Sequence, residues 1–286
     1  MTAAAGPGQP LHSGLNEAFF RSLVDMGAVE ARVRQRLAGL REGPTLLRFF
    51  IDYASWNGCF ANGVAALTSL VGGQRQLFRE PGFARAVADR SNFVAGFFFD
   101  AARDEYDDHI NPLRDSHRCM AQASLLAMQS FFGLDDAVLD EAESAALVAV
   151  NEAVHAGYTG QACAARGAVA QTFAAMGYHL GSELLADREF SLIDEHLRGQ
   201  HHALVQYLMR ASVALAGANH RSYAWVGVHS GHGGAVEADH FDHAAEGARY
   251  ALRYLNGGSM AEAIDALVLG FRTFDADHAR FFAIGR

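Results

Sequence analysis

Cysteine is scarce in this chain, and its distribution excludes the protein classes that depend on it. The 286 residues include only three cysteines, at positions 59, 119 and 163, and no two of them form a C-x-x-C pair. An odd number of widely spaced cysteines does not suit a disulfide framework, a thiolate zinc site or an iron–sulfur cluster. This usage is typical of reduced thiols, and we expect a cytoplasmic protein.

Proline and strand-like patterns are also rare. The chain has five prolines, the last at Pro112, so proline interrupts no helix after that position. Apolar residues recur at spacings of three and four, and no alternating pattern long enough for a useful strand is present. We predict an all-α, single-domain helical bundle over residues 15–286, preceded by a disordered tail over residues 1–14. Helices are expected at 15–40, 44–71, 82–109, 112–132, 135–157, 160–186, 188–216, 234–256 and 259–282.

Positive charge is in deficit. Lys and Arg number 23 against 32 Asp and Glu, which gives a formal net charge of −9. A nucleic-acid-binding protein would carry a basic stripe, and anionic membranes attract basic segments, so the composition disfavours both partners. The first residues lack the basic and apolar regions of a signal peptide, and no apolar run reaches the roughly 20 residues of a bilayer span.

Two carboxylates fall in line with apolar helical stripes. The stripe that starts at Val94 continues at spacings of four and three and reaches Glu105. A second stripe, which starts at Val169, reaches Glu183 in the same way. A carboxylate on the core face of a helix is costly to bury without a partner. Both glutamates are therefore candidate functional residues.

A third segment combines imidazoles and carboxylates on one helix. His240 and His243 share a face, Glu237 and Asp239 flank it, and His232 precedes it in a glycine-rich stretch. Imidazoles one turn apart, with carboxylates one turn away, offer several ligands to one metal site. Carboxylates and imidazoles without thiolates favour iron or manganese, and zinc also fits. With the two glutamates above, they indicate a dinuclear site, and dinuclear iron among helices is a means of activating dioxygen.

These motifs resemble, in order and spacing, those of the haem-oxygenase-like diiron oxidases and oxygenases. Asp104-Glu105 followed by His117 resembles the helix that opens the metal site of that family, and Glu183 resembles the glutamate of its long apolar helix. The resemblance extends from about Phe49 to Phe282. It implies a haem-oxygenase-like fold, two iron ions, dioxygen as co-substrate, and N-oxygenation, C–C cleavage or desaturation of a small molecule.

The resemblance also implies a ligand set. The family's last motif is His, three residues, Asp, two residues, His. With His243 at its final position, His240 stands where Asp belongs and Val236 where the first His belongs. The implied ligands are Glu105, His117, Glu183, His240 and His243, with Glu237, Asp239 and His232 as candidates for the remainder.

The sequence is also compatible with other functions. A ferritin-like diiron protein would use, in order, Glu105, Glu152-x-x-His155, Glu183 and Glu237-x-x-His240. A metal-free enzyme of the thiaminase or cofactorless-oxidase type, with Cys163 as the nucleophile in the thiaminase case, or a small-molecule binder would share the scaffold.

The substrate is less defined by the sequence. Arg118 and Arg221 lie close to the site segments and are suited to hold a carboxylate, while Tyr53 and Trp56 would wall an apolar pocket. We therefore expect an amino-acid-like small molecule of specialised metabolism. A homodimer and an external electron donor are compatible with this interpretation.

Overall fold

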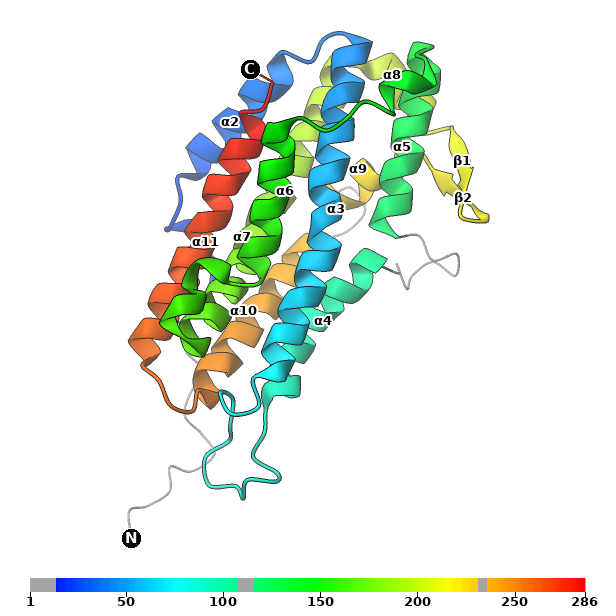
Figure 1. Ribbon diagram of the computed structural model, residues 1–286. Coiled ribbons are helices and arrows are strands. Elements are labelled where there is room, and N and C mark those ends of the chain that lie inside the picture. Colours follow the sequence, from blue (N-terminus) through cyan, green and yellow to red (C-terminus); the bar gives the residue numbers. More distant parts are fainter. Residues whose placement is uncertain (1–13, 107–115, 231–235, 286) are drawn as a thin grey trace.

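The computed structural model describes residues 14–106, 116–230 and 236–285, with the backbone alone for 187 and 236–239 (Figure 1). Most of these residues lie in helices and only two short strands are described, so the predicted all-α, single-domain bundle is confirmed. Of the expected N-terminal tail, only Gly14 falls within the described residues. No described helix is long and apolar enough to cross a membrane.

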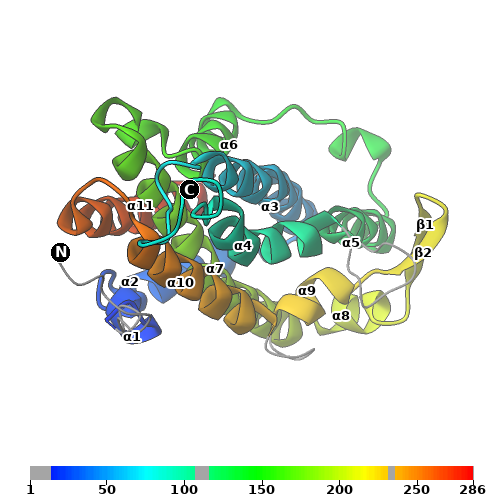
Figure 2. The same cartoon turned by 90° about the horizontal axis from the view of Figure 1, so that it is seen from below.

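Long helices build the bundle. They are α3 (Gly43–Gly73), α4 (Ser91–Tyr106), α5 (His117–Phe132), α6 (Ala145–Tyr158), α7 (Ala168–Gln200), α10 (Val236–Tyr254) and α11 (Met260–Phe282). The shorter elements are α1 (Glu17–Arg21), α2 (Met26–Ala38), α8 (His202–Leu208), α9 (Ala224–His229), two 3₁₀ turns (Asp136–Val138 and Gln161–Arg166) and the strands β1 (Ser212–Leu215) and β2 (Ala218–Arg221). Helix α7 packs against α2, α3, α6, α10 and α11 and lies in the middle of the bundle seen end-on (Figure 2).

Local capping residues explain where several helices begin and end. Pro44 lies in the first turn of α3, where its missing N–H costs nothing. Ser116 caps α5, and its hydroxyl accepts a hydrogen bond from the Cys119 amide. Gly133 ends α5 in the left-handed region, as its sequence predicts. Asp135 also acts as a cap, but of a 3₁₀ turn, and α6 begins later with Ser144 as its N-cap.

The helices expected at 160–186 and 188–216 differ most from the structure. Residues 168–200 form one helix, α7, and the chain then continues through α8 into an antiparallel hairpin, with Ser212 paired with Arg221. The hairpin turns at Ala216 and Gly217, which both have positive φ. Its strands have four residues each, too short for an alternating pattern to stand out, and Ala-Gly is not one of the strong turn signals.

Helices α7 and α11 approach each other backbone to backbone. A Cβ at Gly177 would lie 1.9 Å from the Leu267 carbonyl oxygen, and a Cβ at Gly270 would lie 1.9 Å from the Ala174 carbonyl oxygen. Only glycine fits at both positions. The close approach fixes the register of the two helices.

A polar network enters the aromatic core from the surface. Arg32 on α2 contacts Asp275 on α11 (Nη2–Oδ1, 2.5 Å) and donates through Nε to His278 Nδ1 (2.8 Å). The other ring nitrogen, His278 Nε2, lies 2.8 Å from Glu189 Oε2. The Tyr53 hydroxyl donates to Glu189 Oε1 (2.7 Å). Because an arginine can only donate, His278 Nδ1 must be the acceptor, which leaves the proton of the neutral ring on Nε2.

Candidate functional site

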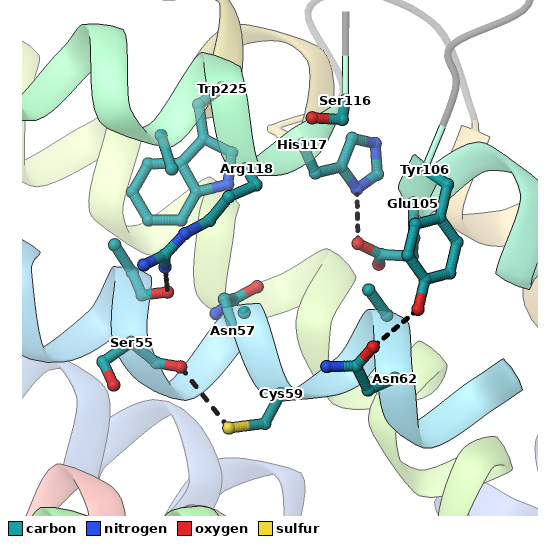
Figure 3. A pocket seen from close by; sticks show the side chains of 14 residues that line it. Ser55, Asn57, Cys59, Asn62, Glu105, Tyr106, Ser116, His117, Arg118 and Trp225 are labelled. Atoms are coloured by element: carbon teal, nitrogen blue, oxygen red, sulfur yellow. Dashed lines mark hydrogen bonds and ion pairs between the residues drawn. The ribbon is translucent and has the colours of Figure 1, made fainter. Parts of the chain in front are cut away.

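Two cavities adjoin each other in the middle of the bundle. The outer one, of about 390 Å³, opens among α3, α4, α5 and α9 (Figure 3). The inner one, of about 30 Å³, lies among α3, α4, α5, α6, α7, α9 and α10. Asn57, Glu105 and His117 line both cavities, so these three side chains form the boundary between them.

Glu105 and His117 form one acid–imidazole pair at this boundary. Glu105 is in the last turn of α4 and His117 is the first residue of α5, and His117 Nδ1 lies 3.1 Å from Glu105 Oε2. Burial alone would raise the pKa of Glu105. The charge of His117 and its hydrogen bond outweigh that effect, with smaller contributions from His229 and His240, and the pKa falls below its ordinary value. Glu105 is therefore an anion at neutral pH.

His240 forms the centre of a second group. Its Nε2 lies 2.7 Å from Asp104 Oδ2, and its Nδ1 lies 3.8 Å from Glu183 Oε2. Because a carboxylate accepts, the proton on Nε2 is the one donated to Asp104. In the neutral ring the lone pair is then on Nδ1, the nitrogen nearer to Glu183. Asp104 thus selects the tautomer of His240.

His179 lies one turn before Glu183 on α7 and is almost fully buried. Its Nδ1 is 3.3 Å from Glu183 Oε1, but neither ring nitrogen makes a hydrogen bond to the described residues. Burial, and to a lesser degree the charge of His240, lowers the pKa of His179 to about 3. The contact with Glu183 is therefore not an ion pair at neutral pH, because the imidazole is uncharged.

His229 brings a further imidazole to the inner cavity from α9. Its Nδ1 lies 2.6 Å from the Trp225 carbonyl oxygen, so Nδ1 carries a proton and, in the neutral ring, the lone pair is on Nε2. The His229 ring lies 4.5 Å from the His117 ring and stacks on Phe190, also at 4.5 Å. Phe190 in turn packs on Tyr53 at 5.4 Å.

The expected ligands divide into three groups. Glu105, His117, Glu183 and His240 all line the inner cavity. His243 is exposed and does not line it. His232 and the side chains of Glu237 and Asp239 lie outside the described residues. The buried face of α10 is formed largely by alanine, at positions 244, 245, 248 and 251. The spacing in the sequence had instead placed His243 on the same face as His240.

Two side chains of this region, Asp104 and His179, are not among the ligands that the sequence predicts. Asp104 is adjacent to Glu105, and His179 is four residues before Glu183 on the same helix. The spacing of four was a usable signal for His179, because residues i and i+4 share a helix face. His229 precedes the histidine-rich helix in the sequence, which leaves open whether it adds a ligand or caps that helix; in the structure it ends α9 and lines the inner cavity.

The structure also places the residues that were predicted to bind the substrate and those that the alternative functions would use. Arg118 lines the outer cavity. Tyr53 and Trp56 are fully buried in the aromatic core and line neither cavity, and Arg221 is exposed on β2. Glu152 and His155 of the ferritin-like ligand set are exposed on α6, away from both cavities. Cys163 is buried and lines neither cavity.

The residue types that line the inner cavity suit a metal ion, but their present arrangement does not. Within the described residues, no three His, Cys, Asp or Glu side chains are arranged to hold a metal ion. The inner cavity has room for about one or two bodies the size of water, and two glutamates and three imidazoles line it. Such donors are ordinary iron ligands. Comparisons of the chain with family models, curated proteins and solved structures find no match.

Proposed function

We propose that the protein is a non-haem iron oxidoreductase that uses dioxygen to oxidise a small molecule. The inner cavity would hold the iron, and two iron ions are expected from the resemblance to haem-oxygenase-like diiron enzymes. The observation that carries the proposal is the convergence of Glu105, Glu183, His117 and His240, from four helices, on one small cavity. Buried carboxylates and imidazoles in this number are costly to bring together for packing alone.

The chain contributes charge and orientation. Glu105 and Glu183 would supply the negative charge that offsets a divalent cation. Asp104 holds the tautomer that leaves a lone pair on His240 Nδ1, and the Trp225 carbonyl does the same for His229 Nε2. Bound iron would supply the one-electron chemistry that dioxygen activation requires. To coordinate it, the present acid–imidazole pairs must separate by side-chain rotation.

The walls of the inner cavity exclude water. Phe60, Val64, Ala101 and Phe190 line it together with the polar groups, and its volume leaves no room for bulk solvent. Substrate would occupy the larger outer cavity, where Glu105 and His117 form the shared wall. A substrate bound there would lie next to the proposed metal ligands.

Anaerobic titration of the apo-protein with ferrous iron tests the proposal. We expect about two equivalents to bind, and oxygen uptake on subsequent mixing with air, followed with an oxygen electrode. Mössbauer spectra of the iron-57-loaded protein would show nitrogen- and oxygen-ligated high-spin ferrous iron. Failure to bind iron, manganese or zinc would contradict the proposal and favour a metal-free enzyme or a small-molecule binder.

A further inference from the structure

One cation faces the outer cavity from the start of α5. Arg118 directly follows His117, and its side chain crosses to α3, where Nη1 donates to the Ala54 carbonyl oxygen (2.8 Å). Its Nε and Nη2 make no hydrogen bond to the described residues. The guanidinium is thus anchored at one nitrogen, and the other two remain as donors on the cavity wall.

Gly58 creates the space in which this guanidinium lies. A Cβ at position 58 would be 2.9 Å from Arg118 Nη1, closer than real Cβ contacts come. Gly58 has no positive φ that would call for glycine, because it lies in the middle of α3. Glycine there costs helix stability, and its evident effect is to let the guanidinium rest against the helix.

An amide lies beside the guanidinium. Asn57 lines both cavities, and its Nδ2 is buried without a hydrogen-bond partner among the described residues. A buried amide N–H₂ without an acceptor is unfavourable, so it calls for an acceptor from a ligand. Figure 3 shows Arg118 and Glu105 on opposite sides of Asn57. A ligand held by Arg118 and reaching past Asn57 would therefore approach Glu105 and His117.

We propose that the outer cavity binds a small organic monocarboxylate, whose carboxylate is held by Arg118 and whose other end points past Asn57 toward the inner cavity. A guanidinium with two unengaged nitrogens offers the paired donors that a carboxylate accepts. Among the described residues that line this cavity, Arg118 is the only arginine or lysine, so it balances one negative charge of a ligand and leaves the second charge of a dianion, such as a phosphate monoester, unbalanced. The inference rests on the proposed function for the reaction, but the binding step needs no metal.

Binding to the metal-free, full-length protein tests the inference. The probes are straight-chain carboxylates of four to eight carbons, each paired with its carboxamide and with the corresponding alkyl phosphate, at millimolar concentrations in calorimetry and thermal shift. We expect the carboxylates to bind at least about tenfold more tightly than either partner. Equal binding of carboxylate and carboxamide, or no carboxylate binding across the series, would overturn the inference.

Variants assign the effect to the guanidinium. We expect Arg118→Gln to weaken carboxylate binding by about 10- to 100-fold, the range for a charge-assisted hydrogen-bonded pair. Gly58→Ala should weaken it as well by displacing the guanidinium, and Arg118→Lys should restore part of the affinity. Arg210→Gln, at an exposed position that lines neither cavity, is the matched control and should bind like the original protein. Retained binding in Arg118→Gln would contradict the assignment.

The two proposals fail separately. Iron binding by the Arg118 variants is measured in the same preparations, with circular dichroism to confirm folding. Carboxylate binding without iron binding would leave the inference standing and remove the proposed function. Iron binding without any preference for carboxylates would leave the proposed function standing and remove the inference.

Discussion

His240 on α10 is held between acidic side chains from two other helices, with Asp104 of α4 2.7 Å from its Nε2 and Glu183 of α7 3.8 Å from its Nδ1. The short contact is a hydrogen bond, and the long one is not. One acid therefore orients the ring, while the other faces the nitrogen that carries the lone pair in the neutral tautomer. Such an orienting acid is a common partner of a metal-binding histidine.

Replacing Glu183 and Glu152 in turn separates the proposed ligand set from the ferritin-like one, because both sets contain Glu183 and only the ferritin-like set contains Glu152. We expect Glu183→Ala to lose most of its iron binding, measured by ferrous titration and by metal content. Glu152→Ala, on the exposed face of α6, should bind iron normally. Loss of iron in Glu152→Ala would instead support the ferritin-like set, and normal iron loading in Glu183→Ala would count against both.

The orienting role of Asp104 predicts a smaller effect. Asp104→Asn keeps the shape of the side chain but removes its charge and its preference for accepting the His240 proton. We expect iron affinity to fall about 10- to 100-fold, the usual effect of losing such a partner. Asp100→Asn, one turn earlier on α4 and exposed, should leave the affinity unchanged. Comparable losses in both variants would point to long-range charge instead of orientation.

His278 predicts a pH dependence of stability. Burial, and then the charge of Arg32, lowers the pKa of His278 well below that of a free imidazole. The unfolded chain therefore binds one proton more than the folded protein below about pH 6.5, and stability is lost as the pH falls toward the folded pKa. The slope from this group is about 1.4 kcal/mol per pH unit. Urea unfolding of the apo-protein between about pH 7 and 5 measures it.

A glutamine at position 278 isolates this contribution. Glutamine does not titrate, yet it is able to accept from Arg32 and donate to Glu189, so His278→Gln should show the shallower pH dependence. His202→Gln, at an exposed position, serves as the control and should keep the original slope. Identical slopes for all three proteins would show that His278 is not neutral in the folded state.

The contact between α7 and α11 predicts a large difference between two glycine-to-alanine changes. Gly270→Ala places a methyl group against the Ala174 carbonyl and should lower the free energy of unfolding by about 3 kcal/mol or more, since backbone must move to accept it. Gly96→Ala, on the exposed side of α4, meets no atom within 4 Å and should stabilise the protein by about 0.5–1 kcal/mol. Thermal and urea unfolding distinguish the two, and equal effects would contradict the contact.

How far the sequence predicts the fold depends on how local its signals are. The helices α3 and α11 begin within a residue of their predicted starts, because Pro44 and Ser259 mark those ends directly. Residues 82–90 of the segment predicted at 82–109 are not helical, and α4 begins at Ser91. Its start depends on Asp89, which accepts hydrogen bonds from Ser91 and contacts Arg75, a long-range partner that periodicity does not reveal.

Some residues of the candidate site can likewise be predicted from local patterns, and others cannot. Glu105 and Glu183 stood out because each interrupts an apolar stripe on its own helix. His243 was predicted to be a ligand, but it is exposed because α10 turns its alanines toward the core. The side chains that pack against this alanine face are on other helices, so the sequence of α10 alone does not reveal it. The burial of Glu189 could not be foreseen, since its partners Tyr53 and His278 lie 136 and 89 positions away in the chain.

Phe190 joins the polar network of the core to the inner cavity, because its ring stacks on His229 and packs on Tyr53. Tyr53 is tied to Glu189, and Glu189 is the residue before Phe190 on the same helix. This short loop of contacts closes on itself, so the ring has little freedom to move aside for an incoming molecule. On this side the shape of the inner cavity is therefore set by the fold. A molecule too bulky for that shape would be excluded, because the Phe190 ring does not move aside for it.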